Sequence, residues 1–105
     1  MEKGACIILT SVENEVDGLK LAKAMIEKRL AACVQVSASG KSIYQWKGEL
    51  HCTDEYYLNI KTTPAASEAL ITWLKQHHPY ETPEILCLNA ESSHEYLEWM
   101  RATTS

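Results

Sequence analysis

Two adjacent histidines, His77 and His78, are the residues of this sequence with the clearest potential for chemistry. They lie in the stretch KQHHPYETPEIL, which also supplies two glutamates and a tyrosine. Neutral imidazole binds copper, zinc and other divalent ions, so the pair is a candidate metal site. Consecutive helical residues point about 100° apart, so the two rings converge on one ion only if a helix ends between them. The third ligand would come from Glu81, Glu84 or another subunit.

The same two histidines also have a structural interpretation. The residue before a proline is pushed out of helical geometry, so Pro79 is expected to end a helix at His78. His77 would then pack below Trp73 and Leu74, while His78 caps a backbone carbonyl or faces water. The residues alone leave both interpretations open.

A second polar set consists of Glu55, Tyr57, Asn59 and Lys61, which alternate with apolar residues in the segment 49–62. Such alternation is typical of a strand with one polar face. Lys61 is placed to donate to an anion in a cleft between subunits, and Glu55 to pair with Lys61 across an interface. The two alternatives are interfacial hydrogen bonds and ion pairs, or a small-molecule pocket.

Sequence patterns of known catalytic sites are missing from the chain. There is no nucleophile elbow, no phosphate-binding loop and no spaced Ser/His/Asp set. None of the four cysteines forms a Cys-x-x-Cys pair. We therefore expect a protein that is not an enzyme.

Length and charge limit the remaining function classes. A chain of 105 residues that is 46% hydrophobic fits a single domain, residues 1–105, with a real core. The net charge of −4 and a longest basic cluster of only Lys28-Arg29 argue against nucleic-acid binding. The few apolar residues before Thr10 are too short for a signal-peptide core or a membrane span, so a cytoplasmic protein without membrane contact is expected.

Hydrophobic patterning predicts the elements that position these residues. The run ACIILTS is typical of a buried strand, and PEILCLN of another. Asn14 and Asp17 have the spacing of a helix N-cap, Thr63-Pro64 starts a second helix, and Ser92 begins a capping box for a third. The first helix is expected to bury one stripe at helical period, formed by Val16, Leu19, Ala22, Ile26 and Leu30.

Two long extended segments, 34–44 and 49–62, are expected to form a hairpin. A two-residue turn at its tip would place Val36 opposite Asn59, an apolar residue against a polar one. A three-residue turn places Val36 opposite Leu58 and matches the two faces. We therefore expect the three-residue turn with Gly48 in the left-handed region, or an equivalent bulge.

The predicted order, β-α-β-β-α-β-α, indicates an α+β fold of the ferredoxin-like split β-α-β type, with an antiparallel sheet and the first two helices on one face. Each hairpin arm has more than ten residues, and is roughly 40 Å long at the usual strand rise. The tip would overhang a small sheet and expose Tyr44, Trp46 and Leu50, which are therefore expected to lie in a subunit interface.

Four segments together are similar to one known family. They are KRLAACVQV, SIYQWKGEL, EYYLNIKTT and HHPYETPEIL, and over about residues 7–100 the chain resembles the CutA proteins, which are named for divalent-cation tolerance. The resemblance implies a homotrimer that pairs its long hairpins between subunits, with an architecture like that of PII signalling proteins. It also implies copper or another divalent ion as partner, with His77 and His78 as ligands. The family's cysteine ligand corresponds here to Thr10, so the sulfur that selects copper(I) is missing.

The function expected from these observations is that of a cytoplasmic, homotrimeric divalent-cation tolerance protein. It would bind copper or another divalent ion and need no cofactor. One alternative is a PII-like sensor with a small anionic metabolite in a subunit cleft formed by Lys61, Glu55, Tyr80 and Glu84. The other is a non-catalytic trimeric scaffold without a ligand.

Overall fold

An antiparallel sheet of five strands forms the centre of the structure, a computed structural model that describes all residues, Met1–Ser105. The strand order is β2-β4-β1-β5, and β3 pairs with the outer part of β4. This order confirms the predicted ferredoxin-like α+β fold. The strands are β1 (Glu2–Val12), β2 (Cys33–Val36), β3 (Gly40–Trp46), β4 (Glu49–Thr62) and β5 (Leu86–Ser92).

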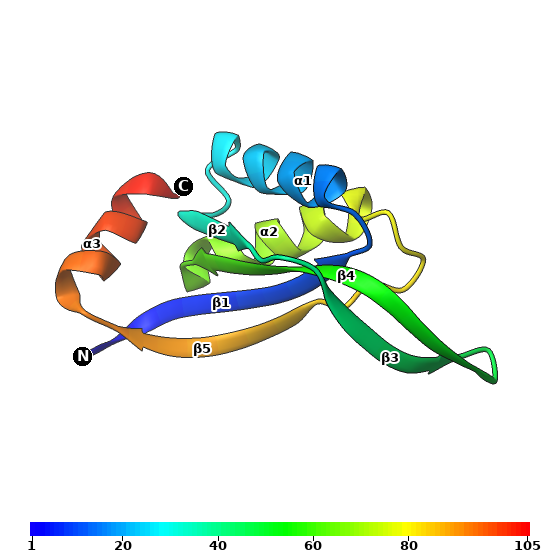
Figure 1. Cartoon of the computed structure of the whole chain (residues 1–105). Coiled ribbons are helices and arrows are strands. Elements are labelled where there is room, and N and C mark those ends of the chain that lie inside the picture. Colours follow the sequence, from blue (N-terminus) through cyan, green and yellow to red (C-terminus); the bar gives the residue numbers. More distant parts are fainter.

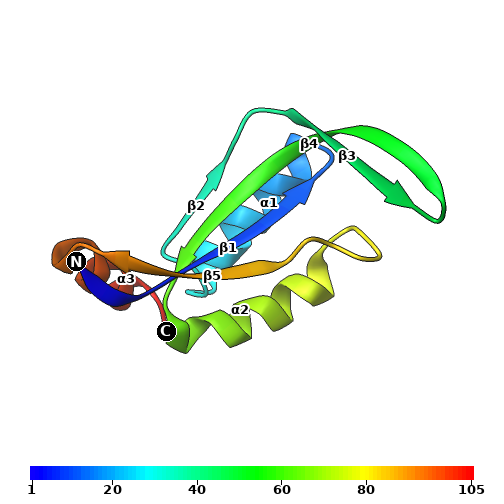
Figure 2. The ribbon, with the colours of Figure 1, turned by 90° about the horizontal axis from the view of Figure 1, so that it is seen from below.

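Three helices complete the fold: α1 (Glu15–Glu27), α2 (Pro64–His77) and α3 (His94–Thr103). In Figure 1, α1 and α2 lie above the sheet, and α3 lies at the end of the molecule where β1 begins. Seen from below in Figure 2, strands β4, β1 and β5 pass in front of α1. None of the helices has the length and hydrophobicity required to cross a membrane.

The helix ends follow the expected chemistry with one exception. The side chain of Asn14 accepts a hydrogen bond from the backbone N–H of Asp17 at 2.8 Å. The side chain of Thr63 caps α2 in the same way, and His78 leaves the helix with φ −68° and ψ 138° before the proline. Helix α3 differs because Ser93, one residue later than predicted, is its N-cap.

The buried face of α1 is not the predicted stripe. Val16 is 65% exposed, and Leu19 and Ile26 are each 41% exposed. The helix instead turns Gly18 toward the sheet, where an added Cβ would lie 3.3 Å from a methyl carbon of Val12. A glycine carries no hydrophobic signal, yet it permits this close approach and so rotates the helix. The residues that α1 buries are Gly18, Leu21, Ala22 and Met25.

The main core lies between the sheet and helices α1 and α2. Its largest fully buried side chains come from every one of these elements, because the apolar face of β4 and β1 meets the inner faces of both helices. They include Ile8, Met25, Leu58, Ile60, Leu70 and Leu74.

The hairpin between β3 and β4 has a two-residue turn, so the predicted three-residue turn is wrong. Trp46 pairs with Glu49, and both Lys47 and Gly48 have positive φ, 51° and 81°. The left-handed Gly48 is confirmed. Val36 still lies opposite Leu58, because the segment between β2 and β3 contains one residue more than the part of β4 opposite it. The bulge that was the alternative to the longer turn therefore restores the register.

The hairpin projects beyond the rest of the molecule (Figure 1), whose longest dimension is 45 Å against 26 and 23 Å for the others. Side chains alternate between its two faces. Tyr44 pairs with His51, and Leu50 pairs with Gln45, one position along. Tyr44 and Trp46 therefore share one face, whereas Leu50 lies on the other face with Ile43.

The C-terminus is fastened to the end of α1 at Arg29, which has a φ of 59°. The guanidinium of Arg29 donates to the backbone carbonyls of Ala102, at 3.0 Å, and Thr104, at 3.4 Å. The backbone N–H of Ser105 donates in return to the Arg29 carbonyl at 3.0 Å. Both chain ends thus lie at the end of the molecule opposite the hairpin (Figure 1).

Candidate functional site

His78 is buried against the end of β1, and both its ring nitrogens have protein partners. Its Nε2 lies 3.0 Å from the Ser11 carbonyl and 3.0 Å from the Thr10 hydroxyl. Its Nδ1 accepts a hydrogen bond from the backbone N–H of Tyr80 at 3.1 Å. Because Nδ1 accepts, the proton of the neutral ring is on Nε2, which donates to the Ser11 carbonyl. Burial lowers the pKa of His78 and so favours this neutral form.

This arrangement limits His78 as a metal ligand. The only lone pair of the neutral ring already accepts the Tyr80 N–H, so metal binding would require that bond to break. The neighbouring side chain is Thr10, which is 1% exposed. A hydroxyl there supplies no soft sulfur ligand. His78 is built into the fold as the structural interpretation of the histidine pair expects.

His77, unlike His78, is exposed to solvent. Its ring is exposed and stacks on Trp73, with centroids 4.4 Å apart and an angle of 17° between the planes. Its Nδ1 lies 2.8 Å from the Trp73 carbonyl and donates to it. The Nε2 lone pair of His77 has no protein partner and faces solvent. The two histidines therefore point in different directions, and no group of three or more His, Cys, Asp or Glu side chains is close enough to hold a metal ion.

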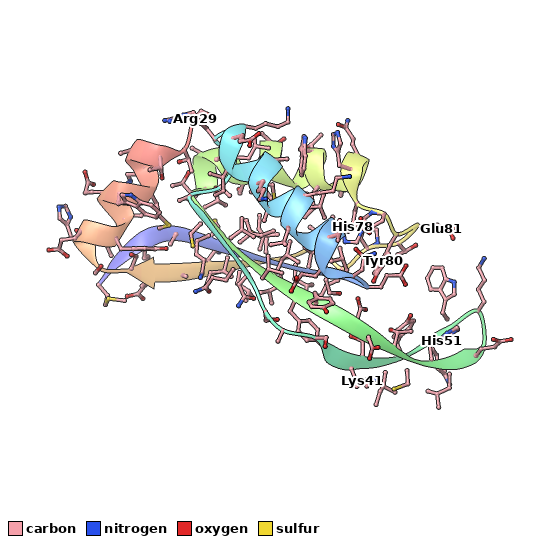
Figure 3. All side chains as sticks on the ribbon, turned by 45° about the horizontal axis from the view of Figure 1, so that its top comes forward. Arg29, Lys41, His51, His78, Tyr80 and Glu81 are labelled. Carbon is pink, nitrogen blue, oxygen red and sulfur yellow. The ribbon has the colours of Figure 1, made fainter.

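A cleft of about 670 Å³ lies between the hairpin and the loop that follows His78. Figure 3 shows His78, Tyr80 and Glu81 at this end of the molecule, next to the hairpin that carries His51, with Arg29 at the opposite end. On the wall of the cleft, the Tyr80 hydroxyl donates to Oε2 of Glu55 at 2.7 Å. Glu55 is only 5% exposed, which is unusual for a carboxylate.

The cleft is negatively charged. Four carboxylates line it, and no Lys, Arg or His side chain does. Burial, and then the adjacent Glu55 carboxylate, raise the pKa of Tyr80 far above its usual value. Tyr80 therefore stays protonated and keeps donating to Glu55. The lining carboxylates are Glu13, Glu55, Glu81 and Glu84.

Three of the four residues predicted for a ligand cleft, Glu55, Tyr80 and Glu84, do line this one. Lys61 does not, because its ammonium donates to the Gln35 side chain on the neighbouring strand β2. No Lys, Arg or His lines the cleft, although the Lys47 ammonium lies 5.8 Å from the centroid of the Trp46 ring on its wall. The anionic metabolite of the sensor alternative stays a prediction, because it concerns a cleft between subunits.

Sequence reasoning missed Ser11 and Glu13 as cleft residues, and the predicted interface role of Tyr44 and Trp46 stays a prediction. Ser11 and Glu13 lie at the end of β1, beside the loop of the HHP segment, and both line the cleft. Tyr44 and Trp46, predicted for a subunit interface, line its opposite wall. Alternation along the strand places Tyr44 and Trp46 on one face, but only the observed two-residue turn separates them from Leu50, because the predicted three-residue turn would pair Tyr44 with Leu50.

The chain matches known proteins over nearly its whole length. The family model described as CutA1 divalent ion tolerance protein matches residues 6–103. The divalent-cation tolerance protein CutA of Thermus thermophilus is 42% identical over 99 residues, which are 93% of this chain and 96% of that protein. The protein of the same name from Pectobacterium atrosepticum is 38% identical over 100 residues, 94% of this chain and 91% of that protein.

Solved structures of CutA proteins also match the chain over nearly its whole length. The structure of the divalent cation tolerance protein from Thermus thermophilus has a TM-score of 0.90 and 41% identity, covering 96% of this chain and 99% of that chain. The structure of CutA from Synechococcus elongatus has a TM-score of 0.92 and 38% identity, covering 97% of this chain and 91% of that chain.

Proposed function

Because the chain belongs to the CutA1 divalent ion tolerance protein family, we propose that it is a non-catalytic, cytoplasmic homotrimer that takes part in divalent-cation tolerance and binds copper or another divalent ion weakly through His77. The observation that carries the metal assignment is the orientation of the His77 ring. Metal-ligating histidines usually donate their second ring N–H to a carbonyl or carboxylate, which fixes the tautomer. The Nδ1 of His77 donates to Trp73 in this way, and its Nε2 is free.

The proposed affinity is weak because one imidazole per subunit is available. A single ligand leaves most coordination positions of Cu²⁺ or Zn²⁺ to water. Binding needs the neutral imidazole, so affinity falls in acid, where protons compete with the metal ion.

Isothermal titration of the purified protein with Cu²⁺ and Zn²⁺ tests the metal assignment. His77→Ala is expected to abolish the binding that the parent protein shows near neutral pH. His94→Ala is the matched control, because His94 is also exposed but lies on α3 beside Glu2. Equal binding by the His77→Ala variant and the parent would contradict the assignment.

The trimer is supported by apolar side chains that a single chain leaves uncovered. Leu50 and Ile43, which share one face of the hairpin, are 74% and 70% exposed. Leu86 and Leu88 on the edge strand β5 are 54% and 50% exposed. Exposed strand edges with apolar side chains normally meet a partner chain.

A second candidate function is the binding of a small molecule in the cleft. The volume of about 670 Å³ falls within the range of ligand-binding pockets. Its wall includes the buried Glu55 and hydroxyl groups such as that of Tyr80, which can orient a ligand. A rise in melting temperature with added ligand, lost in a cleft variant, tests this function.

A further inference from the structure

We propose that the cleft between the hairpin and the loop after His78 binds an aliphatic cation that carries more than one ammonium group. This inference rests on the second candidate function, small-molecule binding in the cleft, and assigns its ligand class. Three features carry it: a largely buried carboxylate with one oxygen that accepts no hydrogen bond from the protein, further carboxylates on the rim, and aromatic rings on the facing wall.

The buried carboxylate is Glu55. Its Oε2 accepts the Tyr80 hydroxyl, but its Oε1 accepts no hydrogen bond from the protein, and Glu55 takes part in none of the ion pairs of the chain. Glu55 is only 5% exposed, and Oε1 is not among the fully buried atoms without a partner, so this oxygen is reached from the cleft. Glu55 lines the cleft, so a ligand ammonium that enters can supply the missing partner.

The other carboxylates explain why the ligand should carry several charges. Glu13, Glu81 and Glu84 line the same cleft but are exposed, at positions on two different segments. No three acidic groups are close enough to coordinate one metal ion, which would require oxygen ligands at about 2.0–2.6 Å. Spaced carboxylates match a flexible molecule whose ammonium groups are themselves spaced. Their solvent exposure makes this part of the attraction sensitive to salt.

The facing wall suits the hydrocarbon part of such a ligand. Tyr44 and Trp46 are 41% and 38% exposed and line the cleft from β3. The Trp46 ring already has a cation over its face, because the Lys47 ammonium lies 5.8 Å from the ring centroid. Aromatic faces attract ammonium groups and also cover methylene chains. A ligand ammonium would therefore compete with Lys47 for the face of this partly exposed ring.

Calorimetric titration of the assembled protein with spermidine tests the proposal. We expect saturable binding that weakens as NaCl is added, and much weaker binding of butylamine, which has a single ammonium group. Glu55→Gln keeps the side-chain shape and an acceptor for Tyr80 but removes the charge, and should weaken spermidine binding by about tenfold or more. Glu95→Gln, an exposed change on α3 outside the cleft, should leave it unchanged.

A second variant guards against the chance that Glu55→Gln fails to fold. Trp46→Leu changes a side chain on the exposed hairpin and should weaken spermidine binding by roughly three- to tenfold. The proposal is overturned if spermidine does not bind saturably, or if both cleft variants bind it as the parent does.

The outcomes for the metal site and for the cleft are separable. His77→Ala should leave spermidine binding unchanged, since His77 is not part of the cleft lining. A neutral or anionic compound that raises the melting temperature of the parent but not of Trp46→Leu, while spermidine does not bind, would overturn the polyammonium assignment and leave small-molecule binding in the cleft standing.

Discussion

At the residue scale, His78 joins the end of β1 to the loop that forms one wall of the cleft. One ring nitrogen reaches Ser11 and Thr10, and the other holds the backbone of Tyr80. Tyr80 in turn donates to Glu55 on β4. A side chain with the type and spacing of a metal ligand thus serves chiefly to position the cleft.

The buried neutral state of His78 predicts a pH dependence of stability. The folded pKa is lowered from 6.5 by burial, so below pH 6.5 the unfolded chain binds more protons than the folded one. The free energy of unfolding should therefore fall as pH drops through 6.5 toward the folded pKa, with a slope of at most about 1.4 kcal/mol per pH unit from this residue. Above 6.5 the effect is absent.

Urea denaturation over a series from about pH 8 to about pH 5 measures this dependence. His78→Gln has no titrating ring, so its stability should change less over the same range than that of the parent. Identical pH profiles for the two proteins would show that His78 is not the group responsible.

Much of the site could be read from the sequence, but its geometry could not. Glu55 was predicted from the polar face of its strand and Tyr80 and Glu84 from the segment that resembles the family, and all three line the cleft. Lys61 lies on the same face of β4 as Glu55, but its ammonium donates a hydrogen bond to the Gln35 side chain on the neighbouring strand β2. Which neighbour a long side chain chooses depends on strand pairing, and a single sequence does not specify that choice.

At the element scale, local signals located the helices well and their orientation poorly. The caps at Asn14 and Thr63 depend on a few neighbouring residues, so the sequence reveals them. The buried face of α1 depends on the close approach at Gly18, a tertiary effect. The hairpin turn was missed for a related reason, since the register depends on the sum of the turn and a distant bulge.

The close approach of α1 to the sheet predicts a strong effect of side-chain size at residue 18. A Cβ added at Gly18 would lie 3.3 Å from a methyl carbon of Val12 and 3.4 Å from a methyl carbon of Val36. Gly18→Leu should therefore lower the free energy of unfolding by about 1–3 kcal/mol, because the extra atoms separate the helix from the core. Guanidinium denaturation measures the change. Val16→Leu at an exposed position of the same helix should stay within about 0.5 kcal/mol of the parent, and a similarly small change for Gly18→Leu would contradict the packing argument.

At the scale of the whole molecule, the projecting hairpin leads to a prediction about assembly. Leu50 is 74% exposed and lies on the opposite face of the hairpin from Tyr44 and Trp46, which line the cleft, and we propose that another subunit covers Leu50 in the trimer. Leu50→Glu should shift the protein from trimer toward monomer, because it would bury a charge in the interface.

Light scattering at micromolar concentration distinguishes the two states, and a metal chelator should not change the result. Lys20→Glu, an exposed change on α1 away from the hairpin, is the control for added negative charge. A parent protein that is a folded monomer would contradict the proposed trimer, and a Leu50→Glu protein with the mass of the parent would exclude Leu50 from the interface.

The fastening of the last residues to Arg29 has a practical consequence for anyone handling this protein. Because both termini emerge at the end away from the hairpin, a dye, affinity handle or surface tether attached to either one is held far from the cleft. Immobilised molecules would present the acidic opening to the flowing solution. Fluorophore pairs placed on a terminus and on the hairpin would also report the long dimension of the subunit directly.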